Sequence, residues 1–398
     1  MRALVIDKTA VLSANHERFA ALAAQPGVEL TVLSPRVWIE HGRSIAAEVT
    51  DAPNYRIVLG RTLGHGRYAR GCYLTGLGRA LRLARPEIVQ LLEEPYSFFA
   101  AQTLRQCRLW APRAKVLFYT WENIYRPFKY PARVSWLYAR IDRRMYRRAA
   151  GAVCATAQAE RVLRLKGFSA PTAVIPYGVP QAFFDAGQDA PRPLNGGSFT
   201  VGYLGRYLAM KGVEDLLSAC SGLPEARLEL FGAGEDETML KSKASQLGLG
   251  ERARFHPPAP PEDVPAVLRR LDALVLPSRT THNWSEQLGR VLIEAMAAGV
   301  PVIAADSGAI PEVLDDAGLL YPEGQAQQLR ARLALIQRDE PARRHLVELG
   351  RRRAAARFTW PRFAADLSAF WRDLLSGRAA APDLSGHRTR ARGQAADA

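Results

Sequence analysis

The sequence lacks any run of about 18 consecutive apolar residues, the length that a helix needs to cross a bilayer. This absence predicts a protein without a spanning helix. The first seven residues, MRALVID, read as a short strand and carry none of the long apolar region of a secretion signal. We therefore expect a cytoplasmic protein that is not exported.

Cysteine is also scarce, with four residues in a chain of 398 and no C-x-x-C pair. Such wide spacing, without a C-x-x-C pair, indicates neither a disulfide framework nor a zinc site. We expect buried free thiols in a reducing compartment at Cys72, Cys107, Cys154 and Cys220. No other pattern of side chains indicates a metal, so we expect no metal site.

The chain has no internal repeat and no heptad pattern. Short apolar runs alternate with helical periodicity instead, which is typical of an α/β fold with helices on both faces of parallel sheets. At 398 residues, 48% of them hydrophobic, the chain is long enough for two domains of about 180 residues each. The predicted strands lie at residues 2–7, 28–34, 55–60, 87–92, 115–120, 151–156 and 172–176, and then at 199–204, 226–231, 253–256, 271–276, 301–305 and 317–322.

Composition sets the boundaries between these parts. A stretch rich in Gly, Pro and Ala at 181–198 predicts a linker between a first domain at 1–180 and a second at 199–357. Residues 358–376 read as an amphipathic helix. The final residues, 377–398, are rich in Ala, Arg and Gly, which indicates disorder. The apolar side of the amphipathic helix consists of Phe363, Leu367, Phe370, Trp371 and Leu374.

Two glutamates, Glu286 and Glu294, stand on either side of a turn that contains Gly289. The turn opens a helix that we expect to end near Gly299. The head of a helix beyond a strand end favours an anion, because its backbone N–H groups lack partners and its dipole is positive there. Carboxylates beside a bound phosphate would contact neutral hydroxyls, so the pattern indicates a ligand with an anionic centre flanked by polyols, as in a sugar nucleotide. The alternative is that both glutamates are solvated acids at a helix start.

A pair of cations follows the predicted strand at 199–204. Arg206 comes just after Gly205, and Lys211 stands at the start of the next helix, so both cations meet at one strand end. The following strand ends in Gly232-Ala233-Gly234, a turn that would let a ligand approach the backbone closely. Each of these pieces alone occurs in many unrelated proteins.

Taken in order, these segments resemble the retaining GT-B glycosyltransferases of family 4, which transfer a sugar from a nucleotide diphosphate to an acceptor hydroxyl. The resemblance covers roughly residues 150–375. It implies two Rossmann-like domains facing a central cleft, with the acceptor in the first, the donor in the second, and a last helix that returns to the first. The matching segments are VGYLGR…KG (201–212), FGAGE (231–235), RFHPP (254–258), LVLPS (274–278), the E-x7-E segment (286–294) with EAMAAGVPVIAADSG (294–308), and IPEV (310–313).

The resemblance also implies roles for individual residues. Arg206 and Lys211 are similar to the pair that grips the donor pyrophosphate, and Glu286 to the residue that holds the hydroxyls of the transferred sugar; these three form the expected catalytic set. Glu294 is similar to the ligand of the ribose. The expected donor-binding residues are Gly205, Gly232, Gly234, Leu288 (where the family usually has Phe), Gly289, Arg290, Val291 and Glu294.

The resemblance implies transfer of a hexose-type sugar, for example from a UDP-sugar, with retention of configuration. The leaving diphosphate would take the acceptor proton, so no protein nucleophile, metal or cofactor is expected besides the nucleotide-sugar co-substrate. The acceptor would be a sugar or a lipid-linked or cell-surface glycan precursor. The alternatives are a soluble small-molecule glycosyltransferase, a nucleotide-sugar epimerase, for which we see no acid/base pair, and an inactive binding relative.

Candidates for the acceptor side come from loops of the first domain. Glu94, Trp121 and Glu122 follow two predicted strands, where acids and an aromatic ring can bind a sugar or its carrier. The alternative is that Glu94 and Glu122 cap the helices that follow. His16 and His65 also lie near loops, although a lone loop histidine is more often solvated than catalytic.

Basic residues outnumber acidic ones by 54 to 39, which gives a formal net charge of +15. The segment 133–148 is rich in arginine and carries an apolar stripe of Trp136, Leu137, Ile141 and Met145. Such a helix could dock on an anionic membrane, and we expect a protein that is peripheral on the inner face of the plasma membrane. The alternative is that the stripe packs on the domain's own sheet while the arginines are solvated. No nucleic-acid-binding motif accompanies the charge, so we expect no nucleic-acid partner.

Overall fold

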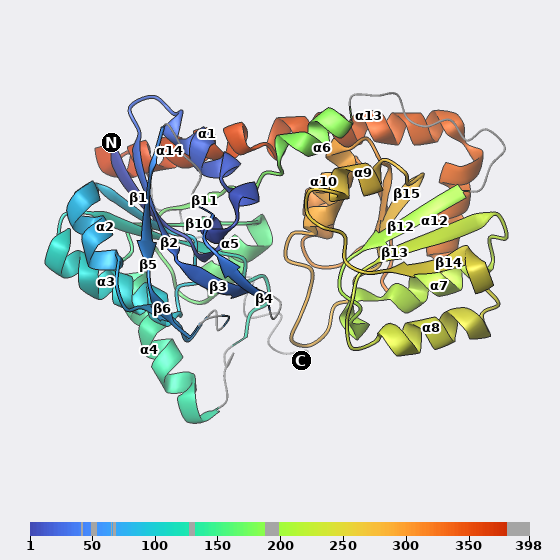
Figure 1. The fold of residues 1–398 in the computed structure, drawn as a ribbon, viewed down its shortest axis with the longest axis horizontal. Coiled ribbons are helices and arrows are strands. Elements are labelled where there is room, and N and C mark those ends of the chain that lie inside the picture. Colours follow the sequence, from blue (N-terminus) through green and yellow to red (C-terminus); the bar gives the residue numbers. More distant parts are fainter. Residues whose placement is uncertain are drawn as a thin grey trace, which may run out of the picture.

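The computed structural model describes residues 1–40, 43–48, 54–64, 66, 69–126, 132–187 and 199–379. Figure 1 shows two α/β domains side by side, each built on its own sheet. The stretch predicted as a linker begins with a helix, α6 (Gln181–Ala186), and its last eleven residues lie outside the described residues. His65 and residues 380–398 of the predicted tail also lie outside them.

Among the described residues, the first sheet has seven strands in the order β11-β10-β9-β8-β1-β2-β5, and every neighbouring pair is parallel. Nearly all residues of β1, β8 and β9 are buried, as expected for parallel strands covered on both faces. The structure also contains two short antiparallel strand pairs, β3–β4 and β6–β7, that the sequence pattern does not predict. The strands are β1 (Arg2–Ile6), β2 (Glu29–Pro35), β3 (Val37–Glu40), β4 (Arg43–Ala46), β5 (Arg56–Gly60), β6 (Thr62–Leu63), β7 (Cys72–Tyr73), β8 (Ile88–Leu91), β9 (Lys115–Thr120), β10 (Gly151–Cys154) and β11 (Thr172–Val174).

Helices cover both faces of this sheet. One face packs against α2 (Leu77–Ala84), α3 (Phe98–Trp110), α4 (Ala132–Arg148) and α5 (Ala157–Leu165). The other face packs against α1 (Glu17–Ala23) and α14 (Trp360–Ser376).

The apolar side of α4 is packed inside the first domain. Ile141 is 8% exposed and Met145 is fully buried in the core beneath α4. The prediction that the stripe faces a membrane is therefore wrong for these two residues, because burial in the domain's own core already removes them from water. Trp136, near the start of the helix, is 64% exposed.

Within the described ranges, the second sheet has six parallel strands in the order β14-β13-β12-β15-β16-β17. Its strands are β12 (Phe199–Leu204), β13 (Ala226–Phe231), β14 (Ala253–His256), β15 (Ala273–Leu276), β16 (Val302–Ala305) and β17 (Leu319–Tyr321). Its helices are α7 (Val213–Ser221), α8 (Glu237–Gln246), α9 (Val264–Leu268), α10 (Arg290–Ala297), α11 (Ile310–Leu314), α12 (Ala326–Arg338) and α13 (Glu340–Arg357). Gly299 has a φ of +72°, which is the left-handed turn predicted after α10.

Helix α14 returns from the second domain to the first (Figure 1). Phe363 and Trp371 are almost fully buried against the first sheet, and the Trp371 indole donates to Oε1 of Gln90 at 3.2 Å. Burying an aromatic side chain of this kind stabilises a fold by about 1.5–3 kcal/mol. The predicted architecture, two parallel α/β sheets joined by a returning helix, is confirmed.

The four cysteines are free thiols, as predicted, and Cys107, Cys154 and Cys220 are buried. Cys72 is partly exposed, so the predicted burial is wrong for this residue. Burial raises the pKa of the Cys107 thiol to about 12. A buried thiol with such a pKa stays protonated at neutral pH and is inert. In the part of the chain that the structure describes, no helix is both long and apolar enough to span a bilayer.

Candidate active site

The donor-side candidates meet where β12 and β15 lie next to each other in the middle of the second sheet. Strands β13 and β14 continue the sheet on one side of this pair, and β16 and β17 continue it on the other. Such a reversal of strand order is the usual ligand site of an open parallel sheet, at the carboxyl ends of the strands. Lys211 follows β12, and Glu286 follows β15, so the order of the strands brings the two loops together.

Lys211 and Glu286 form an ion pair at this point. The Nζ of Lys211 lies 2.7 Å from Oε2 of Glu286, and the Oγ of Ser278 donates to the same oxygen at 2.7 Å. The two charged side chains are 15% and 11% exposed, so water and salt screen the pair less than they would at an open surface. The Lys211 ammonium also lies 4.6 Å from the centre of the Trp284 ring, a cation–π contact.

The start of α10 lies directly after this pair in the chain. Gly289 precedes the helix with a φ of +63°, a conformation that glycine adopts without strain, and it offers no side chain to cap the first N–H groups. Arg290 is exposed, whereas Leu288 is buried in the second-domain core and Val291 packs partly against that core. The backbone at the start of α10 is therefore suited to an anion, while Leu288 and Val291 hold the turn in place.

Glu294 lies one turn into α10 and is ion-paired with Arg290. The Nε of Arg290 is 2.9 Å from Oε1 of Glu294, whose side chain is 14% exposed. Burial raises the pKa of Glu294, and the neighbouring Arg290 opposes this shift. Glu294 is thus a largely buried carboxyl group on α10, the helix that begins at the proposed diphosphate turn.

Arg206 is exposed, and its backbone oxygen accepts a hydrogen bond of 2.7 Å from the Tyr203 hydroxyl. The glycines near it have a packing role that the sequence analysis missed. A Cβ on Gly232 would lie 2.0 Å from the Gly205 oxygen, and a Cβ on Gly234 would lie 2.0 Å from the Tyr207 oxygen. Both glycines are therefore required for the close approach of two backbone segments, whatever a ligand does there.

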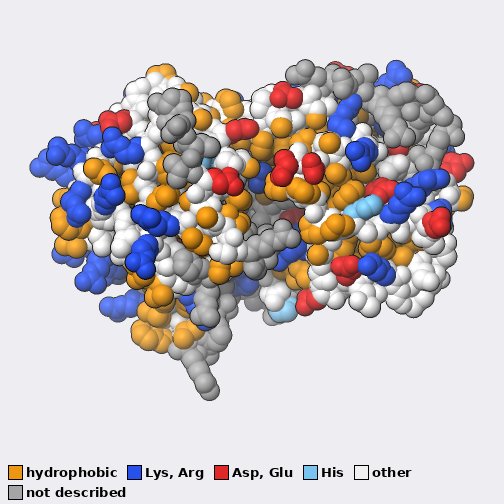
Figure 2. Space-filling view, in the orientation of Figure 1, with side chains coloured by type: hydrophobic (Ala, Val, Ile, Leu, Met, Phe, Trp, Pro, Cys, Tyr) orange, Lys and Arg blue, Asp and Glu red, His pale blue; other side chains and the backbone are white. Residues whose placement is uncertain are grey.

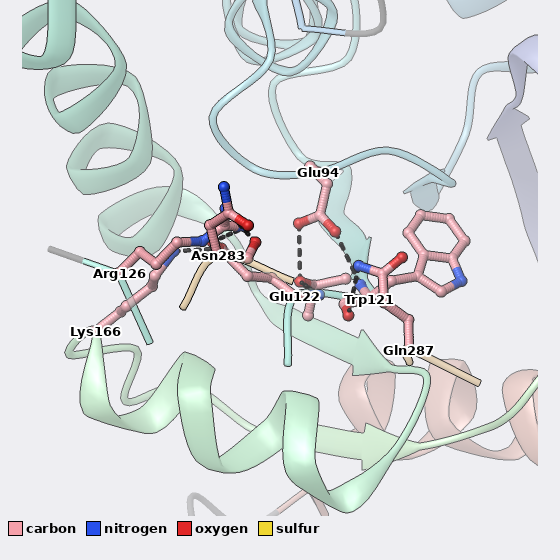
Figure 3. A network of polar contacts seen from close by, with 8 residues as sticks. Glu94, Trp121, Glu122, Arg126, Lys166, Asn283 and Gln287 are labelled. Carbon is pink, nitrogen blue, oxygen red and sulfur yellow. Dashed lines mark hydrogen bonds and ion pairs between the residues drawn. The ribbon is translucent and has the colours of Figure 1, made fainter. Parts of the chain in front are cut away.

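The segment that carries Glu286 also contacts the first domain. Nδ2 of Asn123 donates to the backbone oxygen of Glu286 at 2.7 Å. Figure 3 shows two further contacts, from Arg126 to the Asn283 oxygen at 2.9 Å and from Gln287 to the Trp121 oxygen at 3.1 Å. The loop after β9 and the loop after β15 are therefore joined across the domains.

The comparisons with known proteins cover both halves of the chain. The model of the glycosyl transferase 4-like domain matches residues 14–178, and the model of the glycosyl transferases group 1 matches residues 187–353. The chain belongs to the GT-B glycosyltransferases of family 4.

Relatives of this family-4 chain include two D-inositol 3-phosphate glycosyltransferases. The one from Segniliparus rotundus is 31% identical over 225 residues, which are 52% of this chain and 48% of the relative. The one from Mycobacteroides abscessus is 33% identical over 189 residues, which are 45% of this chain and 40% of the relative. The chain thus spans about half the length, or less, of these curated relatives.

Solved structures resemble the chain over almost its whole length. Sucrose-phosphate synthase from Thermosynechococcus elongatus has a TM-score of 0.67 at 21% identity, covering 94% of this chain and 99% of that one. HepE from Anabaena in complex with UDP also has a TM-score of 0.67, at 16% identity, covering 94% of this chain and 100% of that one. At these identities the likeness shows the shared GT-B fold.

Among the candidates for the acceptor side, Glu94 links the ends of two strands. Its carboxylate accepts from the Thr120 hydroxyl at 2.8 Å and from the Trp121 amide at 2.9 Å (Figure 3). The N-cap of α3 is Ser97, so the alternative that Glu94 caps the following helix is wrong. The sequence could not show this, because the partners of Glu94 lie 26 and 27 residues away.

Glu122 is 5% exposed and ion-paired with Lys166, which follows α5, and its Oε1 lies 4.0 Å from Arg126 (Figure 3). Its carboxylate is therefore bound within the first domain. The ring of Trp121 points away from this cluster and packs on Tyr119 with ring centres 4.4 Å apart. Trp121 is partly exposed.

His16 is buried, with Nε2 lying 2.9 Å from the Ala10 oxygen and its ring edge-on to those of Phe19 and Tyr55. The alternative of a solvated loop histidine is therefore wrong, because packing of helix α1 draws the ring inward. The acceptor role of His16 stays a prediction, and His65 lies outside the described residues.

The sequence pattern does not predict two buried ion pairs that lie just after β1. Asp7 pairs with Arg18 at 2.5 Å, and both side chains are 2% exposed. Lys8 pairs with Glu93, and its ammonium lies 5.0 Å from the centre of the Phe99 ring. Burial raises the pKa of Glu93 to about 7, against the opposing effect of Lys8. Across the described residues, no group of three or more His, Cys, Asp or Glu could hold a metal ion.

Proposed function

We propose that the protein is a retaining glycosyltransferase that moves a hexose-type sugar from a nucleotide diphosphate sugar, such as a UDP-sugar, to an acceptor hydroxyl. The observation that carries the proposal is the Lys211–Glu286 pair at the strand-order reversal, beside the glycine-capped start of α10. A cation and helix N–H groups suit a diphosphate, and a carboxylate beside them suits sugar hydroxyls. The complex of the similarly folded HepE with UDP supports a nucleotide donor.

In the proposed reaction, the acceptor oxygen attacks the anomeric carbon on the face from which the diphosphate leaves. The bond between the anomeric carbon and the phosphate oxygen breaks, and that oxygen keeps the electron pair and takes the acceptor proton. Lys211 and Arg206 would stabilise the charge that grows on the phosphate; one aligned donor in a water-poor site supplies about 3 kcal/mol. Donor binding would move Lys211 from Glu286 to the phosphate and leave the Glu286 carboxylate for the sugar hydroxyls.

The acceptor that we propose is a lipid-linked or cell-surface glycan precursor, reached at an anionic membrane. Figure 2 shows basic side chains gathered over the outer side of the first domain, next to exposed hydrophobic ones. Arginines of α4 border two surface hollows of about 220 and 480 Å³, the second shared with Arg108 of α3. Trp136 on α4 and Leu109 on α3 are each 64% exposed. Cations beside exposed apolar groups suit an anionic lipid surface.

The test of the donor is a panel of UDP-, GDP- and ADP-sugars, with release of the nucleoside diphosphate as the readout. A glycosyltransferase should release it from one or a few of these donors, faster when an acceptor is added. An epimerase would convert the sugar and release no nucleoside diphosphate. Conversion without release, or no turnover of any donor, would contradict the proposal.

A further inference from the structure

The loop after β9 and the loop after β15 meet through side chains that bond to backbone oxygens. Within the described parts of these loops, three such bonds cross between the domains, from Asn123, Arg126 and Gln287, at 2.7, 2.9 and 3.1 Å. Two of them reach oxygens of Asn283 and Trp121, which are not part of the proposed donor site (Figure 3). The bond from Asn123 ends on Glu286 itself.

The backbone of Glu286 is held from both sides. Its oxygen accepts the Asn123 amide from the first domain and the Ala309 backbone N–H, at 2.9 Å, from the second. Gly308 lies so close that a Cβ there would be 2.3 Å from the same oxygen. The Glu286 backbone therefore has little freedom while the Asn123 bond exists, and without it the hydrogen bond from Ala309 would hold this oxygen from the second domain alone.

Asn123 is itself well anchored. It is 5% exposed, and its Nδ2 also lies 3.4 Å from Oε1 of Gln158 on α5. The chain just before it is held by Glu94, which binds the Trp121 amide. A buried donor on an anchored loop fixes its acceptor more firmly than a side chain at an open surface does.

We propose that Asn123 is a positioning residue for sugar transfer, which sets the place of the Glu286 carboxylate through the Glu286 backbone oxygen, across the contact between the two domains. The proposal rests on the proposed function, because it assumes that Glu286 holds the transferred sugar. Asn123 touches no donor group in this scheme. Its effect should therefore appear in the transfer step and not in binding of the nucleoside diphosphate, whose expected contacts all lie in the second domain.

The kinetic test compares Asn123→Ala and the similarly shaped Asn123→Leu with the wild type. Loss of the bond should lower kcat about tenfold, which corresponds to about 1.4 kcal/mol. The calorimetric affinity for the nucleoside diphosphate should stay within about twofold. Arg126→Ala is the matched control, since it removes the cross-domain bond to the Asn283 oxygen and not one on Glu286 or its neighbour, and its kcat should fall much less.

A second readout needs no activity. Hydrogen exchange at the Ala309 amide, which shares the Glu286 oxygen with Asn123, should become faster in Asn123→Ala and stay unchanged in Arg126→Ala. Wild-type kcat in both Asn123 variants, equal losses of kcat and nucleotide affinity, or unchanged exchange at Ala309 would each overturn the proposal. A wild type that turns over no nucleotide sugar would instead contradict the proposed function. Hydrogen exchange at Ala309 would then test only the hydrogen bond from Asn123 to Glu286.

Discussion

The Lys211 ammonium lies 2.7 Å from the Glu286 carboxylate, although 75 residues separate them in the chain. In the proposed reaction the two side chains bind opposite ends of one donor, phosphate and sugar, yet here they neutralise each other. Donor binding would give each partner a new contact, because the phosphate can bind the ammonium and a sugar hydroxyl can bind the carboxylate. Before the donor binds, the cation and the anion therefore neutralise each other. Either charge alone at this sheltered position would make the folded protein less stable.

The first prediction concerns the cations. Arg206→Ala and Lys211→Ala should each lower turnover by about 100-fold or more, because a lost contact of about 3 kcal/mol to the leaving phosphate gives that factor. Circular dichroism should show that both variants remain folded. Steady-state kinetics with the donor found in the panel provides the measurement, and full activity in either folded variant contradicts its assigned role.

The second prediction separates the two glutamates. Glu286→Gln removes the anion that holds Lys211, so binding of the free nucleoside diphosphate should be kept or strengthened while transfer falls by at least about tenfold. Glu294→Gln should weaken that binding about tenfold, through the ribose and through loss of the Arg290 pair. Isothermal calorimetry with the nucleoside diphosphate alone decides, and equal loss of affinity in both variants would refute the division of roles.

Much of this architecture could be predicted from the sequence, because the strands are short buried runs and the turns carry their own signals. Gly289 and Gly299 have the positive φ values that turns at the two ends of α10 require. The apolar stripe of α4 favoured membrane docking, yet Ile141 and Met145 of this stripe are buried, because periodicity says only that a face is covered and not what covers it. Met145 proved to be covered by the first domain itself.

The contacts across the domains could not be predicted in the same way. Asn123 and Glu286 are 163 residues apart, and nothing in the local pattern of either residue distinguishes a cross-domain donor from an ordinary loop amide. The Lys8–Glu93 pair is hidden for a related reason, since a lysine just after a strand normally lies in water. Only the parallel order of β1 and β8 brings these two charges together.

The third prediction follows from the pKa of Glu93, raised to about 7 from an ordinary value of 4.5. Between about pH 4.5 and pH 7, the Glu93 carboxyl is therefore protonated more often in the folded protein than in the unfolded chain. Its contribution to stability is therefore complete below about pH 4.5 and is lost as pH rises through about 7. Glu93→Gln removes this dependence, so the variant should gain stability relative to the wild type from pH 5 to 8. Urea midpoints across this range measure it, and a relative loss with rising pH would show that Lys8 keeps Glu93 ionised.

The last prediction concerns the basic face of the first domain. Because Ile141 and Met145 are buried, attraction to anionic lipid should come mainly from the exposed arginines of α4, with Trp136 adding contact area. The protein should pellet with phosphatidylglycerol vesicles at low salt and be released near 0.5 M salt, where the Debye length is about 4 Å. Binding should not occur to vesicles of phosphatidylcholine alone.

The decisive variant replaces Arg140, Arg143, Arg144 and Arg147 with Ser, and it should lose most of this binding. A matched control replaces four exposed arginines of the second domain, Arg227, Arg338, Arg352 and Arg357, with Ser, which changes the net charge equally. Retained binding in the control shows that position on α4 matters and not total charge. If both variants lose binding equally, or the wild type ignores anionic vesicles, the arginines of α4 are ordinary solvated side chains and a soluble acceptor becomes the better proposal.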